Sequence, residues 1–123
     1  MKNKKLKVLL FDIETAPNLG YVWGKWEQDV ISFKENWYII SCAFKWLGES
    51  KTEVISLPDF PLYKKDKTND LSLCGYIWKL FDEADIVIAH NGDEFDIKKV
   101  NTRFITHELS APEPFKSIDT KKV

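Results

Sequence analysis

Two carboxylates stand at the end of an apolar segment near the start of the chain, where Asp12 and Glu14 close the run that begins at Leu6. Alternate side chains of an extended strand point to the same face, so Asp12 and Glu14 lie side by side with Ile13 opposite. Carboxylates this close repel each other unless a cation lies between them, and Mg²⁺ or Mn²⁺ prefers such oxygen ligands. The pair is therefore a candidate metal site. Taken alone, it could equally be two solvated acids.

A second apolar run, Ile86 to Ala89, also ends in polar residues. Adjacent parallel strands would bring the two strand ends together at the edge where open α/β sheets bind ligands. Asp96 could then supply a third carboxylate from the first turn of a helix, where the helix dipole favours its ionised form. Simpler roles stay open for its neighbours: Asp93 as a helix cap, Glu94 as a solvated acid and His90 as a packed or surface histidine.

The elements that must position these side chains follow from hydrophobic periodicity and turn residues. The segment 17–36 has no clear period and is expected to be a long loop, with room for a short helix. The other expected elements are a buried strand at 6–13, a hairpin of strands 37–46 and 51–57 turning at Gly48, a helix at 70–83, a strand at 86–89, a helix at 94–107 and a strand at 115–118. In the second helix, Lys98, Lys99 and Arg103 fall mostly on the wetter side. This order predicts an α/β fold with a mixed sheet.

The composition indicates one globular domain covering residues 1–123, with 44% hydrophobic and 30% charged residues in 14.4 kDa. The formal net charge of −1 neither favours nor excludes a nucleic-acid partner. Cys42, Cys74 and the two histidines lack the spacing of a zinc site. There is no leader segment and no apolar run of membrane-spanning length, which predicts a reduced, cytoplasmic protein without a membrane partner.

Two stretches of the chain resemble the first two motifs of the DEDD 3′-to-5′ exonucleases, the relatives of polymerase proofreading domains. They are Phe-Asp-Ile-Glu-Thr at 11–15 and His-Asn-Gly-Asp-Glu-Phe-Asp at 90–96. The first motif is moderately specific, and the pair at this distance is fairly specific. The resemblance covers nearly the whole chain and implies a ribonuclease H-like mixed sheet of about five strands, in the order 3-2-1-4-5 with one antiparallel strand, flanked by helices.

The resemblance implies a divalent-metal-dependent 3′-to-5′ exonuclease, with the proofreading part of a DNA polymerase as one form of it. The metal ligands for two ions, Mg²⁺ or Mn²⁺, would be Asp12, Glu14 and Asp96. The substrate would be a single-stranded or frayed 3′ end of DNA, with RNA as an alternative. It would be bordered by a set of four residues: Thr15, Ala16, Asn91 and Phe95. On sequence grounds Phe95 could equally be a core residue.

The family's third motif, a Tyr or His shortly before a fourth aspartate, is not found. The chain ends at residue 123, 27 residues after Asp96. Asp119 is interpreted as a helix cap and not as the fourth ligand. The expectation is therefore an incomplete exonuclease-like domain with weak or no activity on its own.

Two other functions stay open on sequence grounds. A non-catalytic nucleic-acid-binding module would keep the fold without the full site. A haloacid-dehalogenase-like phosphatase also has an aspartate at the end of its first strand, but Glu14 and the lack of a following Gly-Thr argue against it. Trp23, Trp26 and Trp37, in or beside the segment 17–36, could stack on bases or simply pack that segment down.

Overall fold

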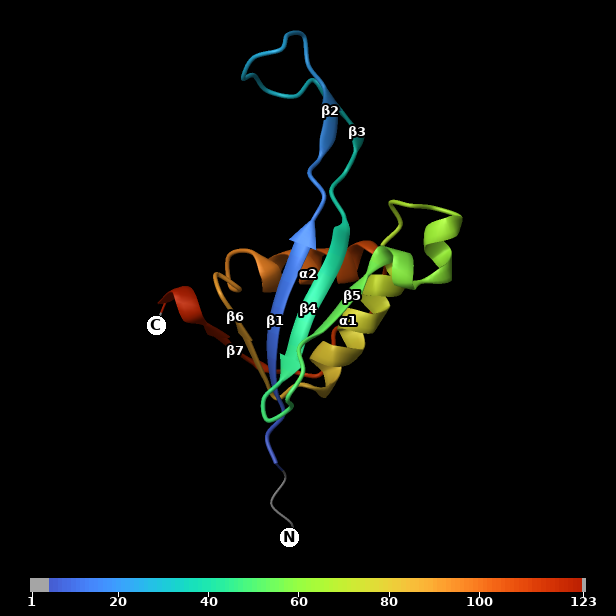
Figure 1. Cartoon of the computed structure of the whole chain (residues 1–123). Helices are drawn as coiled ribbons and strands as arrows, with labels where there is room; N and C mark the ends of the chain where they lie inside the picture. Colours follow the sequence, from blue (N-terminus) through green and yellow to red (C-terminus); the bar gives the residue numbers. More distant parts are fainter. Residues whose placement is uncertain (1–4, 123) are drawn as a thin grey trace.

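A five-stranded mixed sheet forms the centre of the computed structural model, which describes residues 5–122. The strand order is β5-β4-β1-β6-β7 (Figure 1). The bounds of the strands are β1 Val8–Thr15, β4 Ile39–Trp46, β5 Glu53–Ser56, β6 Ile86–Ala89 and β7 Lys116–Asp119. Strands β1, β6 and β7 run parallel, whereas β4 is antiparallel to both β1 and β5. The order and the single antiparallel strand are those predicted.

Both long helices, α1 (Leu71–Glu83) and α2 (Asp96–Thr106), lie behind the sheet in Figure 1. The alternation along β1 explains this arrangement, because Leu9, Phe11 and Ile13 are buried beneath the helices. Phe81 of α1 lies at the centre of this core and makes edge contacts with the rings of Phe11, Phe104 and Phe115. The other face of β1, which carries Asp12, is therefore free to border a site.

Short elements complete the fold. Three 3₁₀ turns are η1 Leu57–Asp59, η2 Pro61–Lys64 and η3 Thr120–Lys122. The turn between β4 and β5 passes through Gly48 with φ +97°, a conformation that glycine adopts without strain. The predicted hairpin and its turning residue are confirmed. No helix within residues 5–122 combines the length and the apolar character needed to cross a bilayer.

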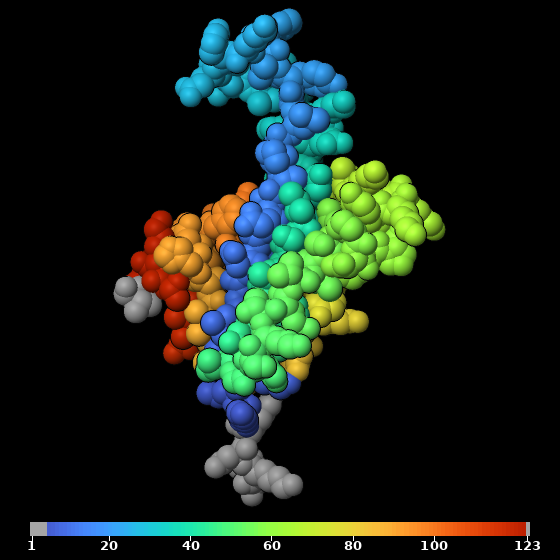
Figure 2. Space-filling view, viewed as in Figure 1, coloured from blue at the N-terminus to red at the C-terminus, as the bar shows by residue number. Residues whose placement is uncertain are grey.

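The segment 17–36 contains two short strands that the sequence did not predict, joined by an irregular loop at 22–31, and it contains no helix. Its strands, β2 (Leu19–Tyr21) and β3 (Ser32–Glu35), form a separate two-stranded sheet that projects from the end of β1 (Figures 1 and 2). We call this segment the arm. Gly20 permits its close pairing, since a Cβ there would lie 2.3 Å from Cγ1 of Val30. The prediction failed because neither face of the arm is buried, so no apolar alternation marks the strands.

The arm leaves large apolar side chains in solvent. Trp23 and Trp26, between β2 and β3, are 89% and 85% exposed. They therefore do not pack the segment down. Trp37, which follows the arm, is partly buried against the hydrophobic core.

Candidate functional site

Asp96 closes the open side of β1 at its carboxyl end. Strand β6 pairs with β1 from Val8 to Leu10 and no farther, so β1 continues beyond its parallel neighbour. The first turn of α2 lies there instead, and Oδ2 of Asp96 accepts a hydrogen bond from the backbone N–H of Ile13 at 3.0 Å. Asp96 is 3% exposed. This contact brings the carboxyl group of Asp96 next to Asp12. The sequence predicted this proximity from the polar residues at the ends of the two apolar runs.

The electrostatics of Asp96 show that this proximity is unfavourable for two ionised carboxylates. Burial and the neighbouring Asp12 together raise the pKa of Asp96 to about 6, although the hydrogen bond from the Ile13 N–H acts to lower it. The pKa of Asp96 is raised and not lowered, so burial and the neighbouring Asp12 outweigh any effect of the helix dipole on this carboxyl group. Burial, with Asp12 and Asp96 nearby, likewise raises the pKa of the Cys42 thiol.

Glu14 stands apart from this pair. It is exposed at the end of β1, on the same face as Asp12 by strand alternation. Among residues 5–122, the donor atoms of Asp12, Glu14 and Asp96 do not form a group of three within 4.8 Å of one another. The fold thus brings two of the three expected ligands together and leaves the third on the neighbouring surface.

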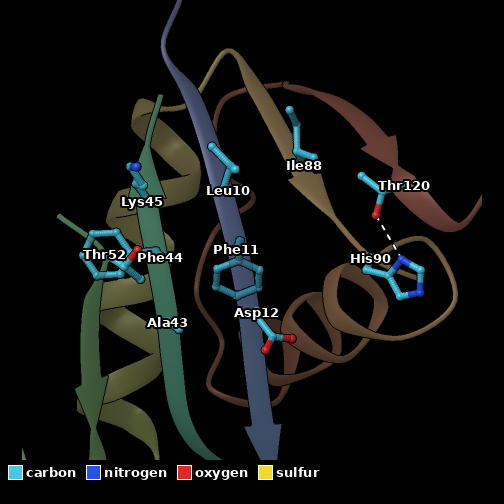
Figure 3. Close-up of a pocket in the computed structure, with 10 residues that line it drawn as sticks. All are labelled: Leu10, Phe11, Asp12, Ala43, Phe44, Lys45, Thr52, Ile88, His90 and Thr120. Carbon is cyan, nitrogen blue, oxygen red and sulfur yellow. Dashed lines mark hydrogen bonds between the residues drawn. The ribbon is translucent and has the colours of Figure 1, made fainter. Parts of the chain in front are cut away.

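A groove of about 580 Å³ lies beside Asp12 on the open face of the sheet. Figure 3 shows Asp12 on β1 and His90 on the loop after β6 at its border, and the groove is also lined by Leu10 of β1 and Ile88 of β6. Nδ1 of His90 lies 3.1 Å from Oγ1 of Thr120, which orients the imidazole ring. His90 is exposed, in agreement with its interpretation as a surface histidine.

Asp119 shapes the turn between β6 and α2. Its carboxylate accepts hydrogen bonds from the N–H groups of Asn91 (2.8 Å), Asp93 (3.3 Å) and Lys121 (2.9 Å). Burial acts to raise the pKa of Asp119, but these N–H donors lower it overall. Asn91 is held at a φ of 57° in this turn. The contact with Lys121 is the capping contact predicted for Asp119, here at the 3₁₀ turn η3.

Asp93 is not the helix cap that the sequence suggested. The residue before α2 is Phe95, and no side chain caps this end of the helix. The carboxylate of Asp93 instead accepts hydrogen bonds from Oγ of Ser117 and Nζ of Lys122. Asp93 therefore ties the turn to β7 and η3.

The expected substrate-bordering residues have mixed surroundings. Thr15 is partly buried at the end of β1, and Ala16 is buried, with its N–H bonded to the carbonyl of Tyr38. Phe95 is partly buried and packs against the core, which was the alternative left open for it. Asn91 and Phe95 belong to the turn that leads into Asp96, whereas Thr15 ends β1 and Ala16 follows it.

Asp70 and Arg103 form a buried ion pair that the sequence analysis did not predict. Asp70 is fully buried, and Arg103 donates to both of its oxygens, from Nε at 2.9 Å and Nη2 at 2.6 Å. The backbone N–H of Ile39 donates to Asp70 as well, and Nε2 of His107 lies 2.5 Å from it. Burial opposes ionisation of Asp70, but these partners lower its pKa overall. The expectation that Arg103 faces solvent is wrong, because its guanidinium group binds the buried Asp70, 33 residues away in the sequence.

Asp70, Cys74 and His107 bring three donor atoms within 4.8 Å of one another, close enough to hold a metal ion. Arg103 already binds both oxygens of Asp70, and burial raises the pKa of Cys74 so that its thiol stays protonated. We therefore interpret the cluster as the ion pair that joins the start of α1 to β4 and α2. The only sequence signal was an acid before a helical pattern, which is typical of an ordinary helix cap.

The fold is ribonuclease H-like, as the strand order and a comparison with solved structures show. No protein-family model and no curated protein matches the chain. Among 52 matching chains of solved structures is the family B DNA polymerase from the hyperthermophilic archaeon Pyrobaculum calidifontis. It is 15% identical with a TM-score of 0.64, and the match covers 98% of this chain and 16% of the polymerase chain. At this identity the likeness shows the fold alone.

Proposed function

We propose that the chain carries the metal-binding part of a 3′-to-5′ exonuclease, with Asp12, Glu14 and Asp96 as the ligands of divalent metal ions. The observation that carries this proposal is the meeting of Asp12 and Asp96 at the carboxyl end of β1, from elements more than eighty residues apart. Strand ends of open α/β sheets are the usual place for ligand sites. The motif resemblance of both segments supports the same assignment.

The donor set fits a hard divalent cation. All three side chains offer carboxylate oxygens, the ligands preferred by Mg²⁺ and Mn²⁺. Asp12 and Asp96 repel each other in the metal-free protein, and a cation between them removes this cost. Glu14 is exposed on the same face of β1 as Asp12 and would be the third ligand. Bound divalent ions supply an activated water and stabilise the charge that develops on the phosphate.

The substrate in this proposal is a single-stranded or frayed 3′ end of DNA, with RNA as the alternative. The similar polymerase fold supports a nucleic-acid partner. Asn91 and Phe95 precede Asp96 in the turn before α2, and Thr15 ends β1. In this proposal they would border the terminal nucleotide, Phe95 with the part of its ring that is not packed against the core. His90 borders the groove beside Asp12 and is available there to bind the strand.

A non-catalytic nucleic-acid-binding module is a second candidate. One observation favours it: Glu14 does not complete a three-ligand group with Asp12 and Asp96. This module would bind a strand but would not hydrolyse it.

The test is the degradation of a single-stranded oligonucleotide in Mn²⁺, followed separately with a 5′ and a 3′ label. An exonuclease of this polarity releases the 3′ label as a mononucleotide and shortens the 5′-labelled strand stepwise. D12N should abolish both effects, and E49Q, an exposed acid at the opposite end of the sheet, should leave them unchanged. Degradation that survives D12N would remove the proposed site, and binding without degradation would favour the second candidate.

A further inference from the structure

Lys99, in the first turn of α2, is held between two aromatic rings. Its Nζ lies 4.3 Å from the ring centroid of Trp37 and 5.9 Å from that of Phe95. Both rings are partly buried and pack against the core, so they form fixed walls for the lysine. The side chain of Lys99 is therefore positioned by its surroundings and does not sample solvent freely.

The ammonium group of Lys99 has no anionic partner within residues 5–122. Its neighbour Arg103, which also lies near the ring of Trp37, is neutralised by Asp70. The faces of aromatic rings attract a cation but carry no net charge. Lys99 is thus a positioned cation whose charge is uncompensated, which is suited to an anionic ligand.

The position of Lys99 in α2 indicates which kind of anion it would bind. Asp96 and Lys99 are three residues apart in α2, and such residues are neighbours on a helix surface, with Cβ atoms about 5–6 Å apart. Asp96 belongs to the proposed metal site, where the scissile phosphate would lie. A phosphate bound by Lys99 would therefore be close to the scissile one along the same strand.

We propose that Lys99 binds a backbone phosphate of single-stranded nucleic acid next to the scissile phosphate, and that Trp37 and Phe95 are positioning residues that hold its ammonium group. The inference rests on the proposed function for the path of the strand. A lysine that only anchors α2 to Trp37 would give the same contacts without any effect on binding.

The experiment measures binding of a 5′-fluorescein oligothymidylate by anisotropy in EDTA, over a series of salt concentrations. A single-strand phosphate contact contributes about 0.7 to the slope of log K against log salt. K99Q should weaken binding and lower the slope by about this amount, and K99R should retain the slope. K98Q, at the exposed neighbouring lysine, is the matched control and should match the wild type. Thermal unfolding of all variants establishes that they are folded.

Trp37 provides a second variant. W37F keeps an aromatic face for Lys99 and should retain the salt slope, whereas W37A should lower it as K99Q does. An unchanged slope in K99Q, an equal loss in K98Q, or no binding of the strand by the wild type would overturn the inference. Lys99-dependent binding without Mn²⁺-dependent degradation would support it even where the exonuclease proposal fails. If D12N abolishes degradation but K99Q leaves the slope of log K against log salt unchanged, the Lys99 site alone would be refuted.

Discussion

Asp96 accepts a hydrogen bond from the backbone N–H of Ile13, the residue that follows Asp12 in β1. One carboxyl group thus has two roles. It satisfies a backbone donor that β6 is too short to reach, and it stands beside a second carboxylate at the candidate metal site. Substitutions of Asp96 should therefore separate stability from metal binding.

We expect D96N to stabilise the metal-free protein at neutral pH while it abolishes metal binding. The amide oxygen of Asn can still accept from Ile13, and the buried negative charge beside Asp12 is removed. The raised pKa of Asp96 corresponds to a gain on the order of 1–2 kcal/mol, allowing for solvent screening. Thermal unfolding in EDTA measures this gain. D96A leaves the Ile13 N–H unsatisfied and should instead destabilise the fold, so equal losses in both variants would contradict the prediction.

Metal affinity should fall steeply as the pH drops below about 6, where Asp96 becomes protonated. One proton displaced per ion gives about a tenfold loss of affinity per pH unit. Calorimetric titration with Mn²⁺ between weakly acidic and neutral pH measures this dependence. An affinity that stays constant through this range would show that Asp96 is not a ligand.

The stability of the metal-free protein should change with pH in the opposite direction. An aspartate has a pKa of about 3.9 in the unfolded chain. The folded-state value of Asp96 is raised to about 6, so its contribution favours the fold at low pH and is lost as the pH rises from about 4 to 6. The difference in the free energy of unfolding between the wild type and D96N isolates this contribution from other groups. That difference should be largest near neutral pH, and a difference independent of pH would disprove the shift.

R103M should destabilise the fold strongly, because it leaves Asp70 buried without its ion-pair partner. Breaking a buried pair from one side costs about 3–5 kcal/mol, a large part of the stability of a small domain. Urea unfolding measures the loss, and K98M on the exposed side of α2 should change stability by no more than about 0.5 kcal/mol. The double variant D70N/R103M should recover part of the loss. If R103M were as stable as K98M, the ion pair would have no structural role.

Removal of residues 20–32, the outer part of the arm, should leave the domain folded. The buried core contains no residue from the segment 20–32, so replacing it with a short Gly-Asn turn removes exposed surface and no core contacts. Cooperative thermal unfolding, with a midpoint close to that of the full chain, is the expected result. A loss of cooperativity would mean that the arm contributes to the fold itself.

Local sequence patterns determined much of this protein. Alternation along the first strand places Asp12 and Glu14 on the exposed face and Ile13 in the core, and it does so without knowledge of any partner. Helical periodicity located both long helices, and Gly48 located the turn of the β4–β5 hairpin. These features depend on residues close in sequence, where periodicity and turn chemistry act directly.

The tertiary structure decided which polar groups meet. Periodicity separates apolar from polar positions, but it does not choose a buried partner for Arg103 among distant acids. It does not show that Asp96 is buried beside Asp12 with a raised pKa while Glu14 stays apart. Neither strand of the arm has a buried face, so its sequence shows no alternation of apolar and polar residues. Contacts across the chain fix the charge state of each carboxyl group, because burial and neighbouring charges exist only after folding.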